Sequence, residues 1–254
     1  MVSHRPPIFG VIVTAHIERT YRRFVNDHIY SRYTVKISET DLYVLTDSDL
    51  HETAYHSALG YRAQIEEYIR YHPEFKTSLI PLPIDNLAPE IIKEMIEAAK
   101  TAGVGPMASV AGAIAEQVGK DLLAYSSNVI VENGGDIYLN IKHDISIGIF
   151  AGDSPLSGRI ALRVSAAETP LGICTSSGTV GHSLSFGVAD AVCIKSESAA
   201  LADAAATSVG NLIKKKSDVK KGLDRAMAIK GVLGVLIVTG DTLAIQGSME
   251  LRRA

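Results

Sequence analysis

The sequence predicts an α+β protein in which mixed, mostly antiparallel sheets pack against helices. Two observations support this prediction. Runs rich in β-branched residues and longer amphipathic stretches occur in mixed groups along the 254 residues, without the strict strand–helix alternation of a parallel sheet. The composition, 46% hydrophobic and 21% charged, is typical of a globular chain with a packed core. We expect one domain over residues 1–254, either a single unit or two closely packed lobes.

The first part of the chain predicts strands followed by long helices. Residues 32–46 contain two β-branched and aromatic runs around Ser-Glu-Thr, which is typical of a hairpin, and residues 9–17 form another short apolar run. In residues 51–72, apolar side chains recur at three- and four-residue steps, which predicts an amphipathic helix. Residues 86–100 predict another helix, with Asn86 as the N-cap, an early proline and a glycine soon after the end.

The middle and end of the chain predict one further helix and a series of strands. The Gly105-Pro106 pair suits a helix start. Small residues then predict a thin helix face that another backbone or a ligand can approach, namely Ala108, Ala111, Gly112, Ala115 and Gly119. Short apolar runs predict strands at residues 128–133, 136–142, 145–151, 158–164 and 188–194. The tail, residues 231–248, predicts a strand pair around a Thr-Gly-Asp turn.

The charge distribution argues against nucleic acid and membranes as partners. The formal net charge is −3, and basic residues are scattered except for a lysine-rich run at 214–221. We expect that run to lie in solvent at a helix end, the alternative being a phosphate-binding patch. The apolar stretch near the N-terminus is too short to span a membrane. Cys174 and Cys193 match no metal or redox spacing, so we expect buried thiols in a reducing, cytoplasmic compartment.

The Ala-rich stretch at residues 199–211 predicts a helix with one polar edge. At about 100° per residue, Asp203 and Thr207 lie one turn apart beside an apolar stripe. A carboxylate and a hydroxyl at this spacing suit Mg²⁺, which takes few protein ligands and keeps several waters. The alternative is a half-exposed aspartate and a threonine that bonds the preceding turn. The apolar stripe consists of Ala202, Ala206, Val209 and Ile213.

Two glycine-rich segments are candidate ligand-binding turns. Residues 133–136 read Asn-Gly-Gly-Asp between two predicted strands, which is a common hairpin connection. Paired glycines also let a backbone approach the phosphates or ring of a ligand, with Asp136 free to bind a hydroxyl or an amide. Residues 175–185 are rich in Gly, Ser and Thr and contain His182, which is either a satisfied loop histidine or part of a site.

In their order along the chain, these segments resemble those of ApbE-like proteins, whose best-known members are FAD:protein FMN transferases. The matching segments are Ala-Gly-Ala-Ile-Ala-Glu at 111–116, Asn-Gly-Gly-Asp at 133–136, Thr-Ser-Ser-Gly followed by His182, and Leu-Ala-Asp-Ala-Ala-Ala-Thr at 201–207. The sequence resembles in particular the uncharacterised protein family 0280, over about residues 33 to 245. The resemblance implies an ApbE-like fold.

The resemblance also implies a flavin or nucleotide site. In the transferases, the Asp and Thr of the last motif ligate Mg²⁺, which activates the FAD pyrophosphate so that FMN passes to a threonine of an acceptor protein. Carried over, this puts Mg²⁺ at Asp203 and Thr207. The flavin, FAD or FMN, would lie against Gly134, Gly135, Asp136, Thr175, Ser176, Ser177, Gly178 and His182. A protein acceptor and a homodimer are further implied partners.

Two departures from the transferase pattern leave the activity open. After His182 this chain has Ser-Leu-Ser-Phe-Gly-Val-Ala-Asp-Ala-Val in place of Ile-Asp-Pro-x-Thr-Gly. Glu116 stands at the position of a lysine, and a carboxylate beside a pyrophosphate predicts repulsion unless a second cation or another ligand is present. Two functions are therefore compatible with the sequence: a Mg²⁺-dependent enzyme that acts on a flavin or nucleotide, or a non-catalytic module that binds a small molecule or a partner.

Overall fold

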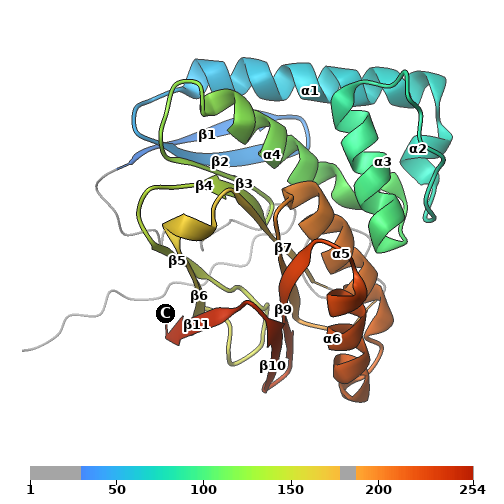
Figure 1. Cartoon of the computed structure of the whole chain (residues 1–254), viewed down its shortest axis with the longest axis vertical. Helices are drawn as coiled ribbons and strands as arrows, with labels where there is room; N and C mark the ends of the chain where they lie inside the picture. The colour runs from blue at the N-terminus through green and yellow to red at the C-terminus, as the bar shows by residue number, and fades with distance from the viewer. Residues whose placement is uncertain (1–29, 178–186, 254) are drawn as a thin grey trace, which may run out of the picture.

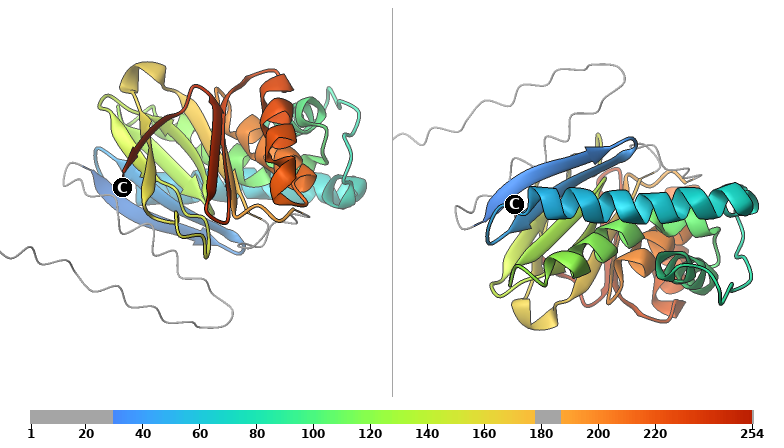
Figure 2. Two further views of the ribbon diagram at one scale, coloured as in Figure 1. Left: turned by 90° about the horizontal axis from the view of Figure 1, so that it is seen from below. Right: turned by 90° about the horizontal axis from the view of Figure 1, so that it is seen from above.

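The protein is built in three layers, seen in a computed structural model that describes residues 30–177 and 187–253 (Figure 1). An eight-stranded sheet forms the middle layer, with the helices on one face and a three-stranded sheet on the other. Figure 2 shows the same arrangement from below and from above. The predicted α+β class is confirmed.

The large sheet is antiparallel at every pairing between its neighbouring strands. Its spatial order is β1-β2-β3-β4-β7-β8-β9-β10. The bounds are β1 Ser31–Ile37, β2 Thr40–Thr46, β3 Val129–Asn133, β4 Asp136–Asn140, β7 Leu171–Ser176, β8 Ala191–Ser196, β9 Val232–Thr239 and β10 Thr242–Gly247. Short connections join β1 to β2, β3 to β4 and β9 to β10, whereas the helices lie in the long connections from β2 to β3 and from β8 to β9.

The small sheet has the order β11-β6-β5 and is also antiparallel. Its strands are β5 Ile145–Gly148, β6 Ile160–Val164 and β11 Glu250–Arg253. Leu162 and Val164 of β6 belong to an apolar core that also contains Leu139 and Leu236 of the large sheet. This second core is the contact between the two sheets.

Six α-helices cover the opposite face of the large sheet in the part of the chain that the structure describes. They are α1 His51–Tyr71, α2 Glu74–Thr77, α3 Glu90–Ala102, α4 Val110–Leu122, α5 Ala199–Leu212 and α6 Val219–Ala228. Three short 3₁₀ turns are η2 Pro106–Ser109, η3 Ala166–Glu168 and η4 Lys216–Asp218. Helix α1 runs along one end of the molecule, whereas α5 and α6 lie side by side further down the sheet (Figure 1).

Most of the predicted elements are confirmed, with differences at their ends. The hairpin, the helices at 51–72 and 199–211 and the final strand pair all form. Asn86 as an N-cap is wrong: α3 starts at Glu90 after Pro89, because Pro at this boundary needs no N–H partner. The helix does end at a left-handed glycine, Gly103, with φ 73°. The predicted run at 9–17 lies outside the described residues.

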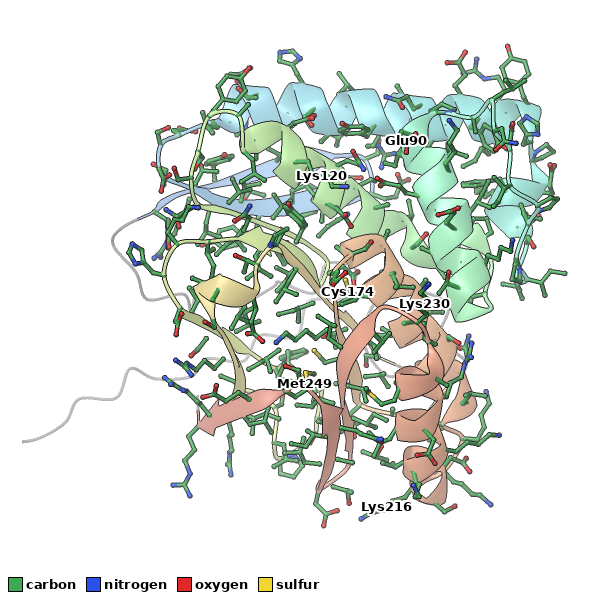
Figure 3. The ribbon with its side chains drawn as sticks, in the orientation of Figure 1. Glu90, Lys120, Cys174, Lys216, Lys230 and Met249 are labelled. Carbon is green, nitrogen blue, oxygen red and sulfur yellow. The ribbon has the colours of Figure 1, made fainter. Side chains whose placement is uncertain are left out.

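Two expectations about surfaces are met in the described residues. Lys214, Lys215 and Lys216 are exposed, as expected, and lie just beyond the C-cap Ile213, although the last turn of α5 itself has no basic residue. Lys216 projects at the far end of the helix pair (Figure 3). Cys174 and Cys193 are buried free thiols. Over the ranges that the structure covers, we find no helix both long and apolar enough to cross a membrane.

Candidate functional site

Asp203 lies on α5, one turn before Thr207, and both are partly exposed on an otherwise buried helix. The predicted stripe explains why: Ala202, Ala206 and Val209 are fully buried against the core. Ser198 caps the helix by accepting a hydrogen bond from the N–H of Leu201, at 3.3 Å. The helix is thus held in place by its apolar face and its cap, and the Asp203 and Thr207 edge is left for other contacts.

The N-terminus of α4 holds the Asp203 carboxylate. The N–H of Gly112 donates to Oδ2 of Asp203 at 2.9 Å, and the N–H of Ala111 also bonds this carboxylate. These N–H groups have no partner inside a helix, and the positive end of the helix dipole favours an anion here. Gly112 is required for this approach, because a Cβ at that position would lie 2.2 Å from the carbonyl oxygen of Ala199. The thin helix face predicted from sequence is confirmed at this point.

The β3–β4 turn brings a second carboxylate, Asp136, to the same place. Gly134 and Gly135 form the two-residue turn with φ of 72° and 103°, a conformation that glycine adopts without strain. Strand alternation puts Asp136 on the helix-facing side of β4, two residues before the buried Tyr138. Asp136 is directly opposite Cys174 of β7. Figure 3 shows Cys174 in the interior, beside the start of α5.

Asp136 and Asp203 are close enough for their charges to interact, and both retain protons more tightly than free aspartate does. Burial, and then the charge of Asp203, raise the pKa of Asp136 well above its usual range. Burial raises the pKa of Asp203 to about 7, even though the Gly112 and Ala111 N–H groups favour its charged form. Within the described ranges, neither carboxylate is ion-paired with a lysine, arginine or histidine. The pair therefore lacks a positive partner from these residues.

The donor set fits a hard divalent cation better than a soft one. Two carboxylates and the Thr207 hydroxyl are oxygen donors, which suit Mg²⁺ with several retained waters. Among the residues that the structure describes, no group of three or more His, Cys, Asp and Glu side chains is arranged to hold a metal ion, so a zinc-type site does not fit. A cation between Asp136 and Asp203 would favour the charged forms that burial disfavours at both residues, and would offset the charge of Asp203 that further raises the pKa of Asp136.

Glu116 has a different role from the one its sequence position suggested. Its Oε2 accepts hydrogen bonds from Ser198 Oγ at 2.9 Å and from the N–H of Ala199 at 2.7 Å, and its Oε1 lies 3.0 Å from Lys120 Nζ. The carboxylate therefore satisfies the N-terminus of α5 from the neighbouring helix. Lys120 is a cation beside Glu116 of the kind that would offset the repulsion expected for a pyrophosphate, and that expectation stays a prediction.

The other predicted site residues do not all meet at this point. The backbone N–H of Thr175 donates to the Asp136 carboxylate, so the backbone of Thr175 is part of the site. The side chain of Thr175 lies on the opposite face of the sheet, where it forms a hydrogen bond with Cys193. Ser176 is the buried last residue of β7, on the same face as Cys174, and Ser177 follows it. Gly178 and His182 lie outside the described residues. The roles assigned to these residues stay predictions.

Three site contacts were not expected from the sequence. The side-chain amide of Asn133 donates to the carbonyl oxygen of Ala111 at 3.2 Å, which ties the glycine turn to α4. Oε1 of Glu132 accepts from the N–H of Gly135 at 2.7 Å and so closes the turn. Cys174 lies against the carbonyl of Ala199, at 3.3 Å from Sγ. The first and third contacts bridge elements distant in the chain, and only Asn133 carried a local signal, as the residue before Gly-Gly.

The fold is shared with solved ApbE structures. The flavinyl transferase ApbE of Pseudomonas stutzeri, in its apo form, superposes with a TM-score of 0.54 at 14% identity, covering 86% of this chain and 94% of that one. The apbe protein of Thermotoga maritima gives a TM-score of 0.53 at 15% identity, covering 86% and 97%. At this identity the likeness shows an ApbE-type fold, as the sequence predicted.

The sequence relatives define the family. The family described as "AbpE bacteria" matches residues 22–250. The UPF0280 protein of Methanococcus aeolicus is 42% identical over 221 residues, covering 85% of this chain and 89% of the relative. That of Methanocaldococcus jannaschii is 42% identical over 219 residues, covering 84% and 89%. The chain belongs to the UPF0280 family of ApbE-like proteins, which confirms the resemblance found from its motifs.

Proposed function

We propose that this protein binds a flavin nucleotide, FAD or FMN, through Mg²⁺ held at Asp203 and Thr207, and that it carries out transferase-type chemistry on the nucleotide pyrophosphate. One observation supports this above the others. Asp136 and Asp203 converge from different elements, with raised pKa values and no cationic side chain paired to them in the described residues. Such carboxylates keep a proton at pH values where free aspartate is charged, and a bound cation could take the place of that proton.

The surroundings of the carboxylates suit a phosphate-bearing ligand. Mg²⁺, when bound, withdraws charge from a phosphorus under attack and from the leaving phosphate. Helix α4 holds Asp203 in one orientation through Gly112, at 2.9 Å. At Gly135 a Cβ would meet only the Thr175 carbonyl oxygen, at 3.8 Å, among the described atoms, so the turn needs glycine for its φ and not for lack of room. A contact between a ligand and the protein backbone of this turn is compatible with that geometry.

The fold supports the proposal only at the level of class. The solved ApbE structures named flavin transferases share the architecture, and ligands commonly occupy the same region of a shared fold. The passing of FMN to a protein acceptor is the finer form of this proposal, and it depends on whether the nucleotide is cleaved. The second candidate, a module that binds flavin without turnover, predicts the same binding and no cleavage.

The test is a fluorescence titration of the purified protein with FAD, with Mg²⁺ or with EDTA. We expect binding that requires Mg²⁺ in the wild type and is about tenfold weaker or absent in Asp203→Asn, because the substitution removes the charge and keeps the size. Asp224→Asn is the matched control, since Asp224 is an aspartate on the surface of α6 that pairs with Lys220. Riboflavin, which has no phosphate, should show no Mg²⁺ dependence.

Release of AMP separates the two candidates. Mg²⁺-dependent FAD binding followed by AMP release that is lost in Asp203→Asn supports transferase-type chemistry. Cleavage needs an acceptor for FMN, either water or the hydroxyl of a threonine-containing protein, so binding with intact FAD after prolonged incubation with such an acceptor supports the non-catalytic module. FAD binding that is the same with EDTA and with Mg²⁺, or the same in Asp203→Asn, contradicts the metal site.

A further inference from the structure

The protein has a cavity that is distant in sequence from the Asp136–Asp203 pair. It is bounded by the end of α1, by α2, by α3 and by the loop that joins α2 to α3. Its volume is about 460 Å³. Three rings line it, those of Tyr68, His72 and Phe75, with Leu82 and Ile84 as aliphatic walls. Tyr68 and His72 stack with their ring centroids 4.3 Å apart, so this wall is flat and aromatic.

The cavity holds two carboxylates, Glu74 and Asp85, and His72 lies close to both. Asp85 accepts hydrogen bonds from the Tyr68 hydroxyl at 3.1 Å and from the Leu87 N–H at 2.9 Å, which fix its carboxylate. Glu74 lies 3.5 Å from Nδ1 of His72. Within residues 30–177 and 187–253, no lysine or arginine is ion-paired with either carboxylate. Two carboxylates beside aromatic faces form a favourable environment for an organic cation, through both charge and cation–π attraction.

The loop that supplies part of the cavity wall, together with the end of α1, carries exposed apolar side chains, which we call the rim. Leu87 is 96% exposed, Tyr71 71%, Ile80 70% and Leu79 62%, and Ile84 is both part of the wall and 40% exposed. Except for Tyr71, these side chains belong to residues 78–89, Ser-Leu-Ile-Pro-Leu-Pro-Ile-Asp-Asn-Leu-Ala-Pro. The prolines restrict the loop, so presenting its apolar residues to a partner requires little further ordering. Several large apolar side chains exposed on one loop beside a cavity are typical of a protein interaction site.

We propose that this surface docks a segment of a partner protein in which a lysine or arginine is flanked by apolar residues. The cationic side chain enters the cavity between the rings and binds Glu74 and Asp85. Its apolar neighbours pack on Leu79, Ile80 and Leu87. A free amine would use the cavity alone and leave these side chains in water, so the exposed rim favours a peptide segment.

A second copy of this chain is a poorer occupant. In a symmetric dimer the same patch faces itself, so Glu74 and Asp85 of one protomer would approach those of the other. Like charges placed opposite one another at an interface oppose association. The charge of the cavity therefore favours a basic partner over self-association.

The docking surface is joined to α4 through a close backbone contact. A Cβ at Gly105 would lie 1.8 Å from the carbonyl oxygen of Ser78, so the start of the loop packs directly on Gly105. Turn η2 and then α4 follow Gly105, and the first turn of α4 holds Asp203. Docking of a peptide at this surface requires no ligand at Asp203.

The experiment is a selection of displayed random peptides on the full-length protein, followed by binding assays of the selected peptides with the double variant Glu74→Gln/Asp85→Asn. We expect enrichment of peptides with Lys or Arg next to Leu, Ile or Phe. By fluorescence anisotropy, their affinity should fall about tenfold in the double variant and in Leu87→Ser. The amides introduced at these two positions would still accept hydrogen bonds, and melting temperatures close to the wild type will show that the variants fold.

Matched controls are Glu67→Gln, an exposed carboxylate on α1, and Ile245→Ser, an exposed aliphatic residue on β10. Both should bind the selected peptides as the wild type does. Enrichment without basic residues, or equal binding by the double variant, would overturn the proposal. So would sedimentation showing a dimer that dissociates in Leu87→Ser, because the surface would then be covered by a second copy.

Discussion

Asp203 is the one ionisable side chain of α5, and its pKa is shifted. Its pKa is raised to about 7 by burial, against an ordinary value near 4 in an unfolded chain. Between these two pH values the folded protein binds more protons than the unfolded chain does. Stability therefore falls as pH rises through this window, the opposite of a salt-bridged aspartate.

The first prediction follows from that sign. In EDTA, the melting temperature of the wild type should fall as the pH is raised from about 4.5 to 7.5, because Asp203 must ionise beside Asp136 in the folded state. Asp203→Asn should remove much of this fall, since an amide does not ionise. Calorimetry at several pH values measures it, with Asp224→Asn as the control. A wild-type melting temperature that rises steadily over this range would contradict the raised pKa.

At the scale of elements, the contact between α4 and α5 sets the position of Asp203. The second prediction concerns Gly112→Ala. The added Cβ would lie 2.2 Å from the Ala199 carbonyl oxygen and 2.9 Å from Cβ of Asp203, so the helices must move apart. Overpacking of this kind costs about 1–3 kcal/mol. Urea denaturation measures it, and any Mg²⁺-dependent ligand binding should weaken in parallel.

Gly60→Ala is the matched control for the helix contact. Gly60 lies inside α1, where an added Cβ meets nothing within 4 Å. The same substitution there should stabilise the protein by about 0.5–1 kcal/mol, because alanine has the higher helix propensity. Equal effects of the two substitutions would mean that the α4–α5 contact is looser than the distances indicate.

The third prediction concerns the cap that α4 provides to α5. Glu116→Ala removes the acceptor for Ser198, Ala199 and Ala200 and leaves Lys120 with one fewer partner. Because buried N–H and O–H donors are left without an acceptor, we expect the free energy of unfolding to fall by about 2–3 kcal/mol. Glu116→Gln keeps an acceptor oxygen and should lose less. Glu97→Ala, on the exposed side of α3, should change little; a loss in Glu97→Ala as large as in Glu116→Ala would contradict the cap.

Local sequence patterns predicted the elements whose burial is one-sided, and missed those decided by tertiary packing. Helix α1 and the β1–β2 hairpin carry their own periodicity. Strand β7, by contrast, is buried on both faces and ends in Thr-Ser, so no alternation distinguishes it from a loop. Helix α6 has a charged sequence, and we did not predict it. Its buried residues, Val219, Gly222 and Ala226, lie on the face that packs against β9.

The site residues also divide into those with a local sequence signal and those placed by tertiary packing. The spacing of Asp203 and Thr207 is local and was predictable from helix geometry. The convergence of Asp136 with Asp203, and the turning of Glu116 toward α5, depend on how β4, α4 and α5 pack. Thr175 shows the limit most clearly: a motif put it in the site, but strand alternation turns its side chain to the other face.

At the scale of the whole molecule, an ion pair between a buried lysine and an exposed glutamate connects the layers. Lys195 of β8 is 2% exposed at its side chain, and its Nζ lies 2.7 Å from Oε1 of Glu168 in η3. Ser248, in the segment between β10 and β11, lies 3.5 Å from the same Nζ. The large sheet, η3 and the segment that leads into the small sheet therefore meet at a single buried ammonium group. The interaction with Lys195 lowers the pKa of Glu168.

The last prediction tests whether this ion pair holds the layers together. Glu168→Gln leaves the Lys195 ammonium without its charged partner, and we expect a loss of about 2–3 kcal/mol in the free energy of unfolding by urea denaturation. Glu90→Gln, which breaks an exposed pair with Lys93, should lose no more than about 0.5 kcal/mol. Because the penalty comes from the unpaired charge, adding Lys195→Met to Glu168→Gln should restore much of the stability. If the double variant is less stable than Glu168→Gln alone, the hydrogen bond from Lys195 to Ser248 and the packing of its stem matter more than the ion pair.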